Sequence, residues 1–227
     1  MHRLFLESDQ GNTRETGEQG DMTTKTKAIY FDFDGVLTLD ATGSMSTCNY
    51  ISAATGIPFD EVMTAYRSFN KDLLLGAKSH ADIWDEWSAM LHGKLEAAHL
   101  NESFESTPMN TDMLELARTL KEQGCKLGII TDNKKDRMRY LRAYHRLDDL
   151  FDTIVVSAEV GFNKHHRAIF DAALDKLQTA PHDSAFIDNN EINLVIPREL
   201  GMTGIYHDDR TNDVEALKRR LDAMLGL

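Results

Sequence analysis

Cysteine is scarce in this sequence, and long hydrophobic runs are missing from it. The two cysteines, Cys48 and Cys125, lie far apart and show no C-x-x-C spacing. We therefore interpret both as reduced thiols and expect a cytoplasmic protein without a disulfide framework. No apolar stretch approaches the length that a membrane-spanning helix needs, so we expect no membrane partner.

Positive charge is also in short supply. Lys and Arg number 25 against 37 Asp and Glu, which leaves a formal net charge of −12. Nucleic acid and anionic membrane surfaces both require a basic patch, so neither is expected as a partner. An anionic substrate can bind to a chain of this composition only if a local cation offsets the repulsion from the net negative charge. The hydrophobic content of 41% over 227 residues is enough for one sizeable core and a smaller module.

The first 24 residues differ in composition from the rest of the chain. They are polar and contain glycine, with one short apolar patch at residues 4–6. They lack the apolar segment of a signal peptide. We predict that residues 1–24 form a flexible tail.

Strand-like and helix-like segments alternate through most of the chain. AIYFDF, from Ala28, is a short and nearly continuous apolar run, which is typical of a strand buried on both faces of a parallel sheet. Helical patterns separate it and the later runs, as in MLELARTLKEQG, where apolar residues recur at i, i+3, i+4 and i+7 before a glycine. This alternation predicts an α/β protein with an open sheet and helices on both faces. The later apolar runs are at 126–130, 153–157, 185–187 and 203–207.

One long segment, residues 40–107, has no convincing strand. It contains three helical patterns, SMSTCNYISAAT, FDEVMTAYRSF and SHADIWDEWSAMLHGKLEAAHL. Trp84 and Trp87 are three residues apart on one helical face, which predicts a small helical core. We therefore predict a helical module at 40–107, inserted into a sheet domain made of residues 25–39 and 108–227.

Polar residues follow four of the predicted strands. Because sites in open parallel sheets form at the carboxyl ends of the strands, we expect these residues to meet at one edge. Any one of them alone is better explained as a turn or a helix cap. All four strand ends together are harder to explain in that way. The residues are Asp32 and Asp34, then Thr131, Asp132 and Asn133, then Lys164, and finally Asp188 and Asn189.

Such a set of side chains is suited to phosphoryl transfer. Two carboxylates two residues apart repel each other unless a cation such as Mg²⁺ lies between them. One carboxylate could attack as a nucleophile, and the other could act as acid and base. The Thr131 hydroxyl, the neighbouring backbone N–H groups and the Lys164 ammonium could stabilise developing negative charge. The pattern therefore predicts an aspartyl-phosphate intermediate.

Four motifs of this sequence resemble those of the haloacid dehalogenase superfamily. YFDFDGVLT is similar to its first motif, IITDN to its second, GFNKHHRAIF to its third and FIDNNEINLVIPRELGM to its fourth. The resemblance extends from Lys27 to Leu227. It implies a Rossmann-like core, with residues 40–107 as the helical cap that one large subgroup inserts after the first motif.

The resemblance also implies roles for individual residues. Asp32 would be the nucleophile, and Asp34 would be the general acid and base. Thr131 and Lys164 would complete the catalytic set. The phosphoryl group would be bound by Thr131, Asp132, Asn133 and Lys164.

Magnesium would be held by the first and fourth motifs. The resemblance implies ligation through Asp32, Asp34 (by its backbone carbonyl), Asp188 and Asn189. The fourth motif matches the variant D-D-x-x-x-N through Asn193, but its second acid is replaced here by Asn189. An amide oxygen adds no negative charge, so we predict that Mg²⁺ binds more weakly than in typical relatives.

A second departure is His165, which stands where the third motif commonly has proline. A proline there mainly shapes the turn into the helix, so little catalytic cost is expected. His165 and His166 also raise the question of a metal site. Since adjacent residues point in different directions on a helix, a solvated surface or a helix start is the better interpretation.

The retained Asp34 decides among the reactions of the superfamily. Phosphatases and phosphomutases keep an acid there to protonate the leaving oxygen, whereas dehalogenases lose it and need no metal. We therefore predict a Mg²⁺-dependent phosphatase that acts on a small phosphorylated metabolite. A phosphomutase, a dehalogenase and a catalytically weak binding protein are the alternatives. A monomer and a homodimer fit the sequence equally well.

Three cations of the predicted cap are candidates for contacting the substrate. They are Arg67, Lys71 and Lys78.

Overall fold

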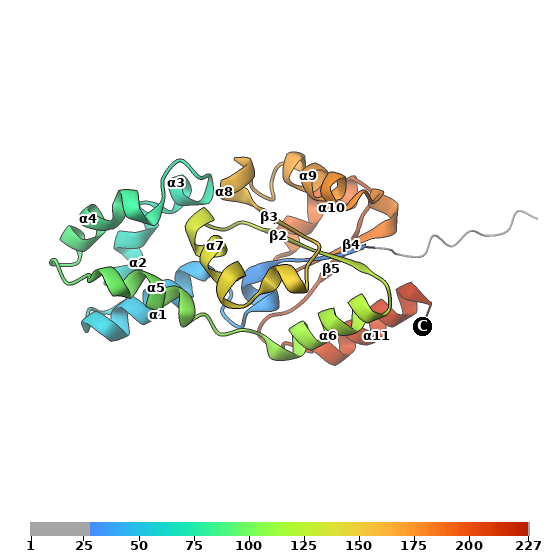
Figure 1. The fold of residues 1–227 in the computed structure, drawn as a ribbon, viewed down its shortest axis with the longest axis horizontal. Helices are drawn as coiled ribbons and strands as arrows, with labels where there is room; N and C mark the ends of the chain where they lie inside the picture. The colour runs from blue at the N-terminus through green and yellow to red at the C-terminus, as the bar shows by residue number, and fades with distance from the viewer. Residues whose placement is uncertain (1–27, 227) are drawn as a thin grey trace, which may run out of the picture.

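The computed structural model describes residues 28–226, so the predicted tail at 1–24 lies outside the described residues. Five parallel strands form a single sheet in the order β3-β2-β1-β4-β5, which confirms the predicted α/β class (Figure 1). The strands are β1 (Ala28–Phe31), β2 (Lys126–Thr131), β3 (Thr153–Val156), β4 (Ser184–Asp188) and β5 (Thr203–Tyr206).

Both faces of the sheet are buried. Successive side chains of a strand point to opposite sides, so each strand contributes to a hydrophobic cluster on each face. Ile29 and Phe31 belong to one hydrophobic cluster, and Ala28 and Tyr30 belong to another. The first cluster packs on α6 (Thr111–Glu122), α7 (Lys135–Tyr144) and α11 (Val214–Leu225), and the second packs on α9 (Arg167–Leu177) and α10 (Val195–Glu199). The short elements α8 (Ser157–Val160), η2 (Leu147–Asp149), η3 (Pro181–Asp183) and η4 (Glu191–Leu194) complete the sheet domain.

The strand order places a topological switch between β1 and β4. From the central β1 the chain builds outward through β2 and β3 on one side, and then through β4 and β5 on the other. At a switch point the connections leave in opposite directions and open a crevice at the carboxyl ends of the strands. Asp32 follows β1 and Asp188 ends β4, so both lie at this crevice.

Residues 43–105 form a helical insertion with a hydrophobic core of its own. Its helices are α1 (Gly43–Thr55), α2 (Phe59–Arg67), α3 (Asn70–Leu74), α4 (His80–Met90) and α5 (Ala97–Glu105), grouped to one side of the sheet in Figure 1. Trp87 is fully buried in this core and meets Trp84 edge to face at a centroid distance of 5.6 Å. The predicted small helical core is thus confirmed.

One predicted helix of the insertion is interrupted. The pattern SHADIWDEWSAMLHGKLEAAHL predicts continuous helix, but α4 ends at Met90 and α5 begins only at Ala97. His92 and Gly93 adopt positive φ angles of 58° and 71° between them. A helix cannot continue through left-handed residues, so the chain turns back here and packs α5 beside α1.

Two connections join the insertion to the sheet domain, and they run side by side. Leu39 N–H donates to the Pro108 carbonyl at 2.8 Å, and Asn110 N–H donates to the Leu37 carbonyl at 2.9 Å. The buried Cys48 lies in the core of the insertion and Cys125 in that of the sheet domain, so the two thiols do not meet in a disulfide.

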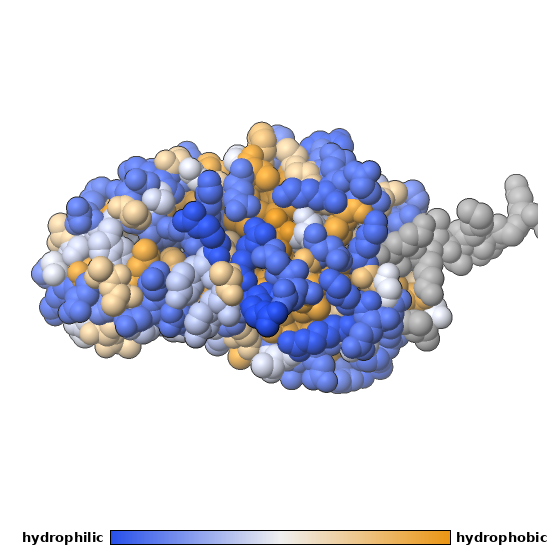
Figure 2. Space-filling view, in the orientation of Figure 1, coloured by the Kyte–Doolittle hydropathy of each residue, from blue (hydrophilic) through white to orange (hydrophobic). Residues whose placement is uncertain are grey.

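The exposed surface is largely polar on the face that Figure 2 shows, with hydrophobic residues gathered in patches near its centre. Between residues 28 and 226, no helix combines the length and the apolarity that crossing a bilayer would require.

Candidate active site

The loop after β1 places two buried carboxylates at the crevice. Asp32 caps the turn η1 (Phe33–Leu37), and its Oδ1 accepts a hydrogen bond from Phe33 N–H at 2.7 Å. Gly35 has a φ of 79°, which lets the chain turn back tightly after Asp34. Asp32 and Asp34 are 6% and 8% exposed, so both carboxyl groups need partners inside the protein.

Lys164 joins the first and fourth strand ends. Its Nζ lies 2.7 Å from Oδ2 of Asp32 and 2.7 Å from Oδ2 of Asp188. The Lys164 backbone N–H donates to Oδ1 of Asp132 at 3.0 Å, which anchors the loop before α9 to the end of β2. The structure therefore brings the predicted site residues of all four motifs together.

The electrostatics of this cluster follow from its burial. Burial raises the pKa of Asp32, Lys164 opposes that rise, and Asp188 adds to it. Burial by itself would lower the pKa of Lys164, but the surrounding carboxylates, Asp32 first, raise it above its usual value. Lys164 thus stays protonated at neutral pH. It lowers the pKa of Asp32 only in part, because burial still raises that pKa to about 8.

Asp188 is fully buried and is held by its own loop as well as by Lys164. Its Oδ1 accepts hydrogen bonds from Asn190 N–H at 2.8 Å and from Asn193 Nδ2 at 3.0 Å. Asn193 is the asparagine of the D-D-x-x-x-N pattern, and this contact is the physical reason for that spacing. Asn189 lies against the first loop, since a Cβ placed on Gly35 would be 2.1 Å from its Nδ2.

The oxygen donors at this point fit a hard divalent cation with few charged ligands. Asp32 and Asp188 already converge on one cation, the Lys164 ammonium. With the Asn189 amide and the Asp34 carbonyl, which follow them in the sequence, they would supply the kind of oxygen ligands that Mg²⁺ prefers. Among residues 28–226, however, no group of three or more His, Cys, Asp or Glu side chains is arranged to hold a metal. Only two carboxylates are therefore at hand to supply the negative charge.

The second motif contributes in a different way from that predicted. Thr131 ends β2 as a buried residue, and its Oγ1 lies 3.4 Å from Nδ2 of Asn133. The Asn133 backbone N–H donates to Ser157 Oγ at 3.0 Å. The Asn133 side chain donates to Oδ2 of Asp34 at 2.8 Å, so this residue supports the carboxylate.

Two buried cations beside the site were missed by the sequence reasoning. Arg137, on α7, is fully buried and forms an ion pair with Asp34 at 2.9 Å. Lys134 is 4% exposed, donates to Ser44 Oγ at 3.0 Å, and lies 5.6 Å from the centre of the Tyr66 ring. Burial lowers the pKa of Lys134 to about 8. Both cations lie in the segment NKKDR, at the end of the second motif. Taken from the sequence alone, this segment is typical of an ordinary solvated helix start.

The remaining predicted cations and histidines make no hydrogen bond or ion pair to the site carboxylates among the contacts of residues 28–226. Burial raises the pKa of Asp132, and His165 lies near enough to that carboxylate to oppose the rise. Of the candidate cap cations, Lys78 is paired with Asp72 at 3.8 Å, and Arg67 and Lys71 are exposed. His166 caps α9 by accepting from Ala168 N–H at 3.2 Å, and His165 is exposed. The interpretation of the histidine pair as a helix start is confirmed.

Comparison with known proteins identifies the family of this chain. The family model of the haloacid dehalogenase-like hydrolases matches residues 29–217. The chain is 27% identical to bifunctional epoxide hydrolase 2 of Rattus norvegicus over 213 residues, which cover 83% of this chain and 38% of the rat protein. It is 26% identical to the pyrophosphatase PpaX of Bacillus cereus strain G9842 over 142 residues, covering 63% of this chain and 52% of PpaX. The chain thus spans roughly a third to a half of these relatives.

Among solved structures, a magnesium complex of a HAD family enzyme from Bacteroides thetaiotaomicron superposes with a TM-score of 0.70. The match has 20% sequence identity and covers 86% of this chain and 99% of that structure. At this identity the likeness shows the fold. Because the family model matches most of the chain and the residues of the four motifs meet at one crevice, this protein belongs to the haloacid dehalogenase-like hydrolases.

Proposed function

We propose that this hydrolase is a Mg²⁺-dependent phosphatase of a small phosphorylated metabolite. One observation carries the proposal: a second carboxylate, Asp34, is retained two residues after Asp32 and is buried beside it. A phosphate ester needs an acid to protonate its leaving oxygen, whereas displacement of a halide does not. The pyrophosphatase relative, PpaX, supports phosphorus chemistry of this kind.

The proposed reaction has two steps. Asp32 attacks phosphorus in line with the leaving alcohol, which takes a proton from the protonated form of Asp34; the second step, which returns a proton to Asp34, regenerates that form. Asp34 then takes a proton from a water molecule that hydrolyses the aspartyl-phosphate. Lys164 and Thr131 stabilise the negative charge on the transferring group.

The helical insertion would act as a cap over this site. It reaches the sheet domain through the Ser157 hydroxyl, which donates to the Leu74 carbonyl at 2.7 Å, and through His80, which contacts Asp136 on α7. A closed cap excludes water and strengthens the electrostatic interactions inside the site. Magnesium, when bound by Asp32, Asp188, Asn189 and the Asp34 carbonyl, would neutralise charge on the phosphoryl group.

The test uses purified protein with para-nitrophenyl phosphate and a panel of phosphorylated metabolites, with and without Mg²⁺. We expect Mg²⁺-dependent release of phosphate that Asp32→Asn reduces by at least about a thousandfold. Asp171→Asn, which alters an exposed carboxylate on α9, serves as the matched control and should keep full activity. Phosphate release that Asp32→Asn leaves intact, or no release from any ester, would overturn the proposal.

A further inference from the structure

Arg137 is the largest charged side chain that the structure buries completely. Its Nη1 donates to Oδ2 of Asp34 at 2.9 Å and its Nη2 to Oδ1 of the same carboxylate at 3.0 Å. A two-point contact of this kind fixes the plane of a carboxylate as well as its position. Nothing in the proposed reaction accounts for a buried guanidinium at this place.

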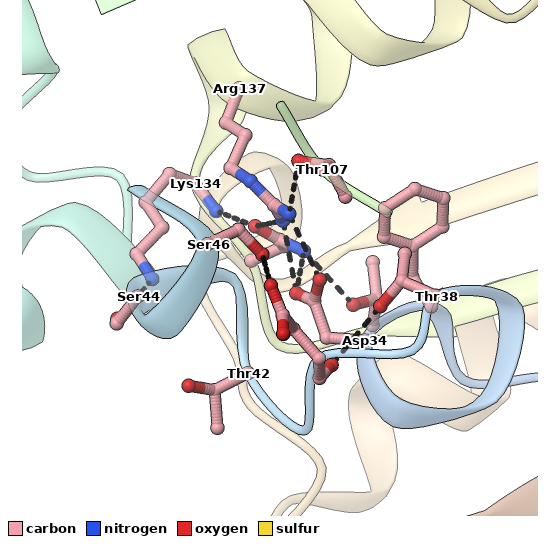
Figure 3. A network of polar contacts seen from close by, with 12 residues as sticks. Asp34, Thr38, Thr42, Ser44, Ser46, Thr107, Lys134 and Arg137 are labelled. Atoms are coloured by element: carbon pink, nitrogen blue, oxygen red, sulfur yellow. Dashed lines mark hydrogen bonds and ion pairs between the residues drawn. The ribbon is translucent and has the colours of Figure 1, made fainter. Parts of the chain in front are cut away.

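The same guanidinium contacts Thr107 on the connection that returns from the helical insertion (Figure 3), and it lies close to Gly43, the first residue of α1. Nη2 donates to Oγ1 of Thr107, on the returning connection, at 3.2 Å. On the outgoing side, a Cβ placed on Gly43 would lie 2.3 Å from Nη1 and 2.8 Å from Oδ2 of Asp34. Only glycine therefore lets the start of α1 approach the Arg137–Asp34 pair so closely.

The orientation of Asp34 depends entirely on groups outside its own loop. Its two carboxylate oxygens accept from Arg137 and from the Asn133 amide, which itself accepts from Nη1 of Arg137 at 3.1 Å. The Arg137 guanidinium also lies over the Phe33 ring, with its Cζ 5.7 Å from the ring centre, and this cation–π contact helps to hold it in place. A displacement of Thr107 or of the start of α1 would therefore shift the guanidinium, and the carboxylate with it.

We infer that Arg137 is a positioning residue that makes the orientation of Asp34 depend on closure of the helical insertion. This inference rests on the proposed function, in which Asp34 transfers the proton. Arg137 touches neither the attacking oxygen nor the phosphoryl site, because its contacts are with Asp34, Asn133 and Thr107. The device would keep Asp34 misplaced, and hydrolysis slow, while the insertion is open.

The kinetic test compares variants on three different segments. In Arg137→Ala we expect kcat for para-nitrophenyl phosphate to fall at least about a hundredfold with KM within about threefold of wild type, because Asp34 loses its orientation while Lys164 and Thr131 still bind the phosphate. Added guanidinium should restore part of kcat, and Arg137→Lys should stay low because an ammonium cannot hold both oxygens. Thr107→Val and Gly43→Ala, which keep the guanidinium, should lower kcat in the same direction. Arg139→Ala, an exposed arginine of the same helix, is the control and should be unchanged.

A second measurement does not require activity. Hydrogen exchange of the connections, residues 38–43 and 106–110, should quicken at least about tenfold in Asp34→Asn and in Arg137→Ala, but not in Arg139→Ala. If exchange there is unchanged in Asp34→Asn, or if Thr107→Val and Gly43→Ala retain wild-type kcat, the inference is overturned. A wild-type protein that hydrolyses no phosphate ester refutes the proposed function instead, and the exchange measurement then decides the coupling alone.

Discussion

Asn189 is the residue at which this site departs most from the pattern of its family. It follows the buried Asp188 and lies against Gly35 of the first loop. An amide oxygen there would ligate a cation without adding charge, which would leave Asp32 and Asp188 as the charged ligands. The strength of metal binding in oxygen sites follows the number of charged ligands.

Restoring an acid at this position should strengthen metal binding. We expect Asn189→Asp to lower the Mg²⁺ concentration that gives half-maximal activity by roughly tenfold, because a third carboxylate joins the set. Titration of phosphatase activity with MgCl₂ measures this. Asn190→Asp is the matched control, since Asn190 is exposed and its side chain caps η4. A variant that requires as much Mg²⁺ as wild type, or more, contradicts the expectation.

Gly35 offers a second test at the level of one residue. Gly35→Ala should destabilise the protein by about 2–4 kcal/mol, because it adds strain at a positive φ and a collision with Asn189. Gly56 has a similar φ of 70° but open space around it, so Gly56→Ala should cost only about 1 kcal/mol. Urea unfolding of the two variants separates the collision from the strain. Equal losses of unfolding free energy in the two variants would show that the Asn189 side chain moves aside at no cost.

Between elements, the contact of α4 with α7 joins the insertion to the sheet domain. The His80 backbone N–H donates to Oδ2 of Asp136 at 2.9 Å, its Nδ1 lies 2.8 Å from Oδ1, and its Nε2 lies 2.7 Å from the Tyr66 hydroxyl. Burial lowers the pKa of His80, although Asp136 opposes this and Lys134 and Arg137 nearby reinforce it. Burial would raise the pKa of Asp136, but its hydrogen bonds to His80 hold that pKa at about 2. We take His80 as neutral at pH 7, with Nδ1–H donating to the Asp136 carboxylate and Nε2 accepting from Tyr66.

This arrangement predicts a loss of stability in mild acid. The unfolded chain binds a proton at His80 with a pKa of about 6.5, whereas the folded protein resists that proton. The stability contribution is therefore complete above that pH and falls as the pH drops below it. We expect the free energy of unfolding to fall more between pH 7.5 and pH 5.5 in wild type than in His80→Gln. The control is His165→Gln, which alters an exposed histidine and should follow wild type, and equal slopes for wild type and His80→Gln would refute the neutral assignment.

At the scale of the whole molecule, the charge of −12 opposes the approach of an anionic substrate. The buried Lys164 offsets this field only at short range, where screening by salt is weak. Added salt screens the long-range repulsion over about 8–10 Å at 0.1–0.15 M ionic strength. We expect kcat/KM for a phosphate monoester to rise about two- to fivefold between 10 and 150 mM NaCl. Sucrose of equal osmolarity is the control, and a fall in kcat/KM with salt would show that local cations dominate the encounter.

Much of the fold and the centre of the site could be predicted because their signals are local. Five short apolar runs, four of them followed by polar residues, are enough to indicate a parallel sheet, and parallel strands necessarily bring Asp32, Thr131 and Asp188 to one edge. The same reasoning predicted Lys164, since the loop before α9 must start from that edge. The break between α4 and α5 was not predicted, although the sequence offered a local signal for it: Gly93 has a φ of 71° and its N–H donates to the Ser88 carbonyl at 2.7 Å, as a glycine that ends a helix does.

The sequence by itself determined the sheet, the helical insertion and the catalytic strand ends, since periodicity and motif spacing act over a few residues. Only the tertiary structure decided which cations are buried. Arg137 meets Asp34 across 103 positions of the chain, and His80 meets Asp136 across 56. Charged residues at a helix start are usually solvated, and no local pattern distinguishes a buried one. The physical reason is that burial and pairing depend on which elements pack together, within the sheet domain for Arg137 and Asp34 and between the insertion and the sheet domain for His80 and Asp136.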